Sequence, residues 1–178
     1  DATQGSDVVR ESFRLINEAG TVLPVDGTGI TIGVMSNSFD RQPFSAGNSS
    51  KATLDVIAGD LPGEGNQYYN APVEVLMDYP YGVASDEGRA MMHIIHDVAP
   101  GAKLAFHTGS LSPRNFEVGF NALAVESNII VDDISFITEP FFGEGRISAV
   151  INSFTDGGGI HFTSAGNFGD NGYQSNFS

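Results

Sequence analysis

Carboxylate side chains are the groups of this sequence that could move a proton. Glu87 falls in the first turn of a predicted helix, where it could act as a general base and accept a proton from a hydroxyl group. A free glutamic acid has a pKa of about 4.3, so such a base works best in acid unless burial raises its pKa. Alternatively, Glu87 and the adjacent Asp86 only complement the positive end of the helix dipole. Both roles stay open at this point.

A second pair of carboxylates, Asp132 and Asp133, falls in a predicted strand. Neighbouring side chains of a strand point to opposite faces, so at least one of the two must be buried, lie at a cleft or pair with an arginine. We expect structural pairing, with Arg89 or Arg146 as the partner. A role at a catalytic site is the alternative.

The sequence gives little support for a metal site or for cysteine chemistry. His93 and His96 are three residues apart on a predicted helix, but the only carboxylate downstream is the adjacent Asp97, and no His-Glu-x-x-His pattern occurs. Asp-rich loops would suit calcium, yet the Asp-x-Asp-x-Asp ligand series is absent. We therefore predict no metal and no cofactor. The sequence has no cysteine, which excludes a thiolate nucleophile, a disulfide and Cys-ligated zinc.

The elements that must position these side chains follow from the hydrophobic periodicity. Strands alternate with helices, which predicts βαβ units and a three-layer α/β domain with a mainly parallel sheet of at least five strands. One of the helices has Ala90, Met91, Ile94, Ile95 and Val98 on its apolar stripe. We predict a single domain over 1–178, with a helix and lead-in over 1–27. The expected helices are 7–19, 52–58, 86–98, 112–126 and 146–154, and the expected strands are 29–36, 73–77, 104–107, 129–135 and 160–165.

Ligands of parallel sheets bind beyond the carboxyl ends of the strands. Polar residues directly after the predicted strands are therefore the most informative ones, and they include Asn37, Asp40 and Asn167. Asn167 follows Gly166 and could donate its amide to an oxyanion, or it could be a turn residue with left-handed backbone.

Charge and hydropathy limit the partners. The chain of 178 residues carries 22 acidic and 8 basic side chains, a formal net charge of −14, so a nucleic-acid-binding surface is not expected. No apolar run reaches the roughly 20 residues that a membrane helix needs, and no leader of basic then apolar residues opens the chain. We expect no membrane span, and a secreted or cell-envelope location.

Three segments, read in order, resemble the subtilisin-like serine peptidases, or subtilases. Residues 32–40 are similar to the strand and turn that carry the catalytic aspartate of that family. Residues 86–104 resemble the histidine-bearing helix and its connection to the next strand. Residues 159–169 contain Ala165-Gly166-Asn167 and are similar to the strand that ends at the oxyanion amide. The resemblance covers roughly residues 28–170.

The resemblance implies roles for individual residues. Glu87 stands at the place of the histidine, as the general base does in the related sedolisins, although their paired aspartate is replaced here by Met91. Asn37 stands near the place of the missing aspartate, with Asp40 as the other candidate, and Asn167 corresponds to the oxyanion donor. Residues 131–136 resemble the strand that pairs with substrate, which makes Asp133 and Ser135 candidates, as are Asp86 and Gly166.

The implied function is that of a secreted subtilase-like endopeptidase that hydrolyses a polypeptide substrate through an acyl-enzyme. A Gly-Thr-Ser turn for the nucleophile does not occur, so this chain is expected to be the amino-terminal part of a subtilisin-like catalytic domain that is incomplete at its C-terminal end. Without that missing C-terminal part it should be inactive. The alternative is a catalytically dead subtilase-like binding or scaffold domain. A third interpretation, a flavodoxin-like domain, lacks a convincing phosphate loop after the first strand.

Overall fold

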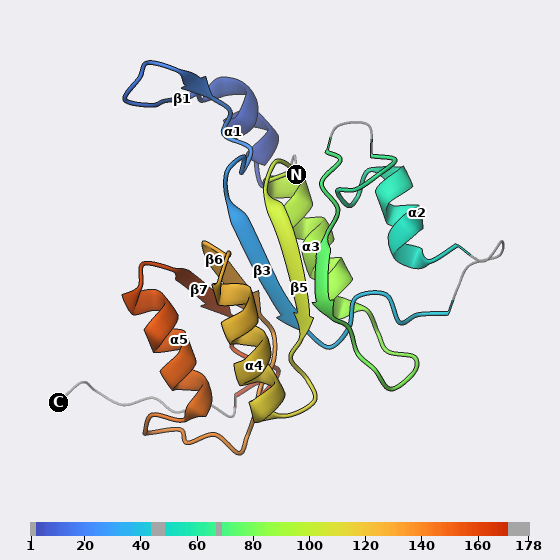
Figure 1. Ribbon diagram of the computed structural model, residues 1–178, viewed down its shortest axis with the longest axis vertical. Helices are drawn as coiled ribbons and strands as arrows, with labels where there is room; N and C mark the ends of the chain where they lie inside the picture. Colours follow the sequence, from blue (N-terminus) through green and yellow to red (C-terminus); the bar gives the residue numbers. More distant parts are fainter. Residues whose placement is uncertain (1–2, 44–48, 67–68, 171–178) are drawn as a thin grey trace.

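A five-stranded parallel sheet forms the centre of the molecule in the computed structural model, which describes residues 3–43, 49–66 and 69–170 (Figure 1). The strand order is β4-β5-β3-β6-β7, and every neighbouring pair is parallel. The prediction of an α/β fold with a mainly parallel sheet is confirmed. The strands are β3 (Thr31–Ser36), β4 (Glu74–Met77), β5 (Lys103–Thr108), β6 (Ile129–Asp132) and β7 (Ile160–Thr163).

Helices lie on both faces of this sheet (Figure 1). On one face α3 packs over β3 and β5, with α2 beside it; on the other face lie α4 and α5. Alternate residues of β3 divide between the two hydrophobic cores, because Val34 packs with Met92 of α3 whereas Met35 packs with Phe116 and Phe120 of α4. The helix bounds are Lys51–Ala58 for α2, Glu87–Val98 for α3, Pro113–Ala124 for α4 and Arg146–Asp156 for α5.

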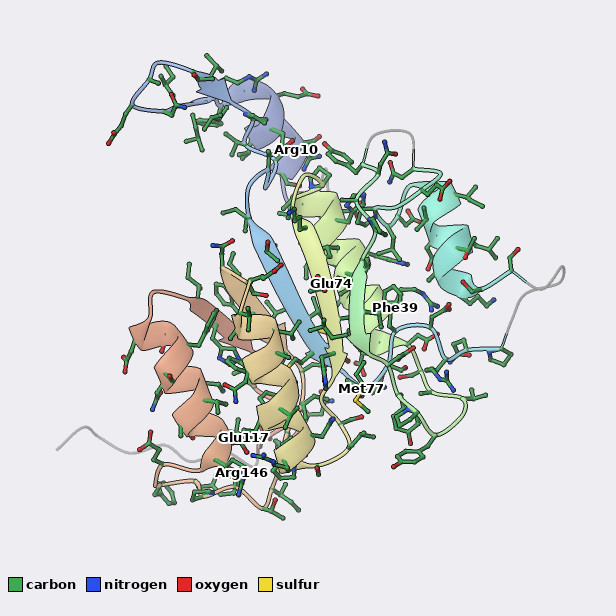
Figure 2. All side chains as sticks on the ribbon, viewed as in Figure 1. Arg10, Phe39, Glu74, Met77, Glu117 and Arg146 are labelled. Atoms are coloured by element: carbon green, nitrogen blue, oxygen red, sulfur yellow. The ribbon has the colours of Figure 1, made fainter. Side chains whose placement is uncertain are left out.

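The α4 helix follows its sequence signals closely. Ser112 is the N-cap and its hydroxyl accepts a hydrogen bond from Asn115 N at 3.1 Å, with Pro113 in the first turn. Near the same end of the helices, Glu117 of α4 and Arg146 of α5 form an ion pair of 2.6 Å, and Figure 2 shows the two side chains next to each other. The expected pairing of Arg146 with Asp132 or Asp133 is therefore wrong.

The predicted helix over residues 7–19 is wrong beyond its first half. Helix α1 (Ser6–Ser12) ends before Phe13, whose backbone is extended, and two short antiparallel strands follow, β1 (Leu15–Ile16) and β2 (Val22–Leu23). The apolar stripe finds no described surface to cover it, since Phe13 is 61% and Ile16 70% exposed. A helical stripe that packs against nothing does not stabilise a helix, and short helices are marginal by themselves.

The helix predicted over 86–98 forms, but its apolar stripe is only partly correct. Met91 and Ile95 pack against the core, whereas Ile94 is 60% exposed. The buried residues of α3 also include Arg89, which pairs with Asp55 of α2, and His96, which lies beside Asn66. Gly88 allows the helix to approach the sheet closely, because a Cβ there would overlap the ring of Phe106. The helix orientation is set by polar contacts that hydrophobic periodicity does not describe.

We predict that Gly119→Ala destabilises the protein although alanine favours helix by about 1 kcal/mol over glycine. Gly119 is buried in α4, and a Cβ there would overlap the imidazole ring of His107 on β5. Overpacking of this kind costs about 1–3 kcal/mol, which urea unfolding would measure. Asn121→Ala, at an exposed position of the same helix, is the control and should leave stability equal or slightly higher.

Candidate functional site

The candidate site lies where β3 and β6 end and α3 begins. We call the side chains of Ser36, Asn37, Glu87 and Asp133 the strand-end site. β3 and β6 are parallel neighbours, with Met35 opposite Asp132, so the residues that follow the two strands lie at the same edge of the sheet. Gly88 N of α3 donates to Ser38 O at 3.1 Å, which brings the start of that helix to the same place.

Asn37 connects the end of β3 to the start of α3. Its side-chain oxygen accepts hydrogen bonds from Glu87 N at 3.3 Å and from Ser38 Oγ at 3.1 Å, while its side-chain nitrogen donates to Ser85 Oγ. Thr108 Oγ1 of β5 donates to the backbone oxygen of Asn37 at 2.7 Å. The structure therefore brings together Asn37 and Glu87, two residues singled out from sequence. The contact is made by the backbone of Glu87, and its exposed carboxylate is left accessible to a ligand.

Asp86 is buried next to the strand-end site and holds several groups around it. Its carboxylate accepts hydrogen bonds from Ser38 Oγ at 2.9 Å, Arg41 N at 2.6 Å and Gln42 N at 2.9 Å, and it pairs with Arg89 at 2.7 Å. Among the described residues it is the only non-glycine with positive φ, at 57°. The surrounding hydrogen bonds hold it in this rarely populated conformation. Asp86 is thus no surface carboxylate, and it positions the first turn that carries Glu87.

The pKa of Asp86 reflects these partners. Burial by itself works to raise the pKa, but the hydrogen bonds from Arg41 N, Gln42 N, Ser38 and Arg89 together outweigh it and lower the pKa of Asp86 below its ordinary value. The carboxyl group therefore stays ionised in the folded protein.

Arg89 gathers three carboxylates under the first turns of α3. It pairs with Asp86, with Asp55 at 2.8 Å and with Asp40 at 3.3 Å, and it donates to Phe39 O at 2.7 Å. The expected pairing of Arg89 with Asp132 or Asp133 is wrong. Asp40 also accepts from Ala52 N at 3.2 Å, so the structure places this candidate with Arg89 and α2 rather than with Asn37.

Asp133 follows β6 directly, because that strand ends at Asp132 and not at Ser135 as predicted. Its Oδ2 accepts a hydrogen bond from Ser36 Oγ at 3.0 Å, and its Oδ1 is buried without a partner among the described residues. Burial raises the pKa of Asp133 above its ordinary value, and the negative charges of Glu87 and Asp132 raise it further, against the effect of the Ser36 hydrogen bond. The charge of Glu87 therefore acts on the carboxyl group of Asp133 at the strand-end site.

The loop after β7 carries the remaining candidates. Gly166 has a φ of 77°, and a Cβ there would lie 3.4 Å from Ser135 Oγ, so Ser135 and Gly166 are neighbours. Asn167 is exposed, and its side chain makes no hydrogen bond within the part of the chain that the structure describes. Because β7 is the parallel neighbour of β6, this loop leaves the sheet at the same edge as Asp133.

Four hydroxyl groups lie at the site. Ser38 and Thr108 fall directly after predicted strands, which is the position where polar residues were expected to be informative. Ser36 ends its strand and was not singled out. Ser85 carries no such signal, because only the tertiary fold brings it to Asn37.

The two helix histidines do not form a metal site in the described ranges. His93 Nε2 lies 3.0 Å from Asp55 Oδ2, and His96 is buried with its Nε2 3.4 Å from Asn66 Nδ2. Across residues 3–43, 49–66 and 69–170, no group of three or more His, Cys, Asp or Glu side chains is arranged to hold a metal ion.

A scan against protein-family models, a search of curated proteins and a search of solved structures each found no match for this chain. In the described residues, no helix combines the length and the apolar character needed to cross a membrane. What the chain does is therefore inferred from the strand-end site itself and from the motifs in the sequence.

We predict that Arg89→Met destabilises the protein by about 3–5 kcal/mol, because it leaves buried carboxylates without their cation. Arg114→Met is the matched control. Arg114 also pairs with a carboxylate, Glu117 at 2.8 Å, but its side chain is 68% exposed, so its loss should change the free energy of unfolding by at most about 0.5 kcal/mol. Equal effects of the two substitutions in urea unfolding would contradict the role given to Arg89.

We predict that Asp133→Asn becomes more stable relative to wild type as the pH rises. Because the pKa of Asp133 is raised in the folded protein, its carboxyl group favours folding below the ordinary pKa of 3.8, and this contribution is lost as the pH rises through the folded value. Asparagine does not titrate. Urea unfolding of both proteins from acid to neutral pH would show the difference in their free energies of unfolding.

Asp86→Asn is the control with the opposite sign. The pKa of Asp86 is lowered by folding, so its contribution to stability is present above 3.8 and is lost as the pH falls through the folded value. The Asn variant should therefore be weakest relative to wild type near neutral pH and approach it in acid. Parallel profiles for the two variants would refute these assignments.

Proposed function

We propose that this chain belongs to a secreted, subtilase-like serine endopeptidase in which Glu87 is the general base. The observation that carries the proposal is the strand-end site: an exposed glutamate in the first turn of α3 stands beside a partly buried acid, Asp133, whose pKa is raised. A carboxyl group with a raised pKa near a second, exposed carboxylate at the carboxyl edge of a parallel sheet is suited to proton transfer.

The arrangement of the three motifs supports this proposal. A subtilase-like site requires the end of the strand in residues 32–40, the start of the helix in residues 86–104 and the end of the strand in residues 159–169 to converge. Here β3 ends at Ser36, α3 begins at Glu87 and β7 ends at Thr163. All three lie at one edge of the sheet, with the Asn37–Glu87 hydrogen bond joining the first two.

In the proposed reaction, a serine hydroxyl attacks the carbonyl carbon of a peptide bond while the Glu87 carboxylate takes the hydroxyl proton. The amide of Asn167 donates to the oxyanion that forms. When the carbon–nitrogen bond breaks, Glu87 returns the proton to the leaving amine. Water then attacks the acyl-enzyme ester, again with Glu87 as base, and releases the carboxylic acid and the free serine.

The serine nucleophile is proposed to lie outside the 178 residues of this chain, as the resemblance implies. The hydroxyls packed most deeply at the site are engaged and hidden from solvent. Ser36 is fully buried and donates to Asp133, and Ser38 is fully buried and donates to Asp86.

The exchange of aspartate for Asn37 is compatible with a glutamate base. A histidine base needs a carboxylate that fixes its tautomer and stabilises its positive charge. A glutamate has no tautomer to fix and becomes neutral when it accepts a proton, so it does not need a carboxylate for either purpose. Asn37 instead holds the backbone of Glu87, and its neutral side chain adds no further negative charge beside a base that must itself be ionised.

Asp133 is proposed to be the partner acid of Glu87. Because burial and the charge of Glu87 raise its pKa, Asp133 loses its proton at a higher pH than an ordinary aspartic acid does.

We predict that Glu87→Gln lowers peptide hydrolysis by about 100-fold or more, since glutamine cannot accept the proton. The assay uses the full-length protein with a peptide mixture from acid to neutral pH, together with a fluorophosphonate probe that labels an activated serine. Glu126→Gln, an exposed position at the other end of the molecule, is the control and should keep full activity. Labelling that is lost only in Glu87→Gln is the expected result.

Folded wild-type protein that neither hydrolyses peptides nor reacts with the probe at any pH would overturn the proposal. That outcome would instead favour the catalytically dead binding domain, for which the amide at Asn37 is the specific observation.

A further inference from the structure

A buried acid and a buried imidazole lie directly behind the strand-end site. Asp132, the last residue of β6, has a side chain that is 2% exposed, and His161 of β7 has one that is 8% exposed. His161 Nε2 donates to Asp132 Oδ2 at 2.7 Å. This pair plays no part in the proton transfer proposed above, and no sequence motif singled out His161.

The Asp132 carboxylate shapes the turn that carries Asp133. Its Oδ1 accepts a hydrogen bond from Ile134 N at 3.1 Å, so the side chain of one residue holds the backbone two residues later. The residue between them is Asp133. Fixing both sides of Asp133 fixes the direction in which its own side chain leaves the backbone, toward Ser36.

The same carboxylate connects this turn to the neighbouring strand. Thr163 Oγ1 donates to Asp132 Oδ1 at 3.0 Å, and the backbone oxygen of Asp132 accepts from Ser164 N at 3.1 Å. Ser164 begins the loop that leads to Gly166 and Asn167. The exits of β6 and β7, which carry the proposed acid and the proposed oxyanion donor, are therefore held together through one residue.

Charge adds a second connection. Burial raises the pKa of Asp133, and the negative charge of the neighbouring Asp132 raises it further. A buried carboxylate such as Asp132 needs a partner, and His161 supplies a donor to it.

We propose that Asp132 and His161 are positioning residues for Asp133, because they hold the turn that carries it. This inference rests on the proposed function, in which Asp133 is the partner acid of Glu87. The groups that face the pair in the described residues are the ring of Phe120 from α4, 5.5 Å from His161 between ring centroids, and the hydroxyl of Thr163 from β7. Asp133 itself faces Ser36 from β3 and Glu87 from α3.

The test follows the carboxyl carbon of Asp133 by NMR as the pH changes, in the full-length protein without substrate. Asp132→Asn keeps an oxygen that accepts from Ile134 N and Thr163, but removes a negative charge, so the Asp133 midpoint should move to lower pH. His161→Leu removes the donor to Asp132, and its effect on the turn is measured by the hydrogen exchange described next. His96→Gln, at a buried histidine on α3 beside Asn66, is the control and should leave the Asp133 midpoint unchanged.

Amide hydrogen exchange checks the turn separately. Asp132→Ala should expose the Ile134 amide and speed its exchange at least about tenfold, whereas Asp132→Asn should preserve its protection. His161→Leu should also speed this exchange, because Asp132 loses the donor that holds it, whereas His161→Gln should preserve the protection. Equal Ile134 exchange in all variants, or an Asp133 midpoint that does not move to lower pH in Asp132→Asn, would overturn the inference. A purely structural pair would produce that second result.

The titration needs no catalysis, so the two proposals fail separately. Loss of peptide hydrolysis in every form of the protein, with the Asp133 midpoints shifted as expected, would reject the peptidase and retain the positioning pair. Peptide hydrolysis together with an Asp133 midpoint that does not move in Asp132→Asn would retain the peptidase and reject the positioning pair.

Discussion

The ion pair between Arg89 and Asp86 is buried under the first turn of α3, where water solvates neither charge well. Each charge must therefore be satisfied by protein groups, and this requirement fixes the surrounding chain. Asp86 accepts hydrogen bonds from the backbone nitrogens of Arg41 and Gln42, and Arg89 forms ion pairs with Asp40 and Asp55. Glu87 follows Asp86 in the chain, so the buried Asp86–Arg89 ion pair fixes where Glu87 lies. The same ion pair thus positions the exposed carboxylate that is proposed as the base.

The architecture could be predicted from sequence where local signals and burial agree. Ser112 and Pro113 mark the start of α4, and Phe116, Phe120 and Leu123 are buried as their spacing predicts. The predictions of helix faces and lengths were wrong where something other than apolar periodicity decides which side chains are buried. Periodicity placed Ile94 of α3 toward the core, but Ile94 is exposed. Arg89 and His96 are buried instead, because hydrogen bonds and ion pairs satisfy their polar groups. In the N-terminal segment, a regular apolar pattern did not become a longer helix because the described structure offers its side chains no partner.

The site was predicted as a set of positions and not as a set of contacts. Asn37 follows from the rule that polar residues after parallel strands meet at one edge, whereas Glu87 and Asp133 were singled out as carboxylates and through the resemblance to subtilases. The contacts of Asn37 with Ser85 and Thr108, and of Asp132 with His161, were not predicted, because these residues are distant from each other in the sequence. The expected arginine partners of Asp132 and Asp133 were wrong for the same reason: a hydroxyl and an imidazole were closer in space than any guanidinium. The roles of Asn37, Glu87, Asn167 and Ser135 in catalysis remain proposals.

The central place of β3 has a kinetic consequence. This strand is the first of the sheet to be synthesised, yet it lies between β5 and β6, and the hydrogen bond from Ser36 to Asp133 joins residues 97 positions apart. Closing so large a loop costs conformational entropy before the contacts that stabilise it have formed. Parallel sheets dominated by distant pairings therefore fold slowly. On the ribosome, β3 must wait with two unpaired edges until β5 and β6 have emerged. The groups that make the site are therefore assembled late, after the nascent chain has passed through a stage in which β3 can pair with wrong strands.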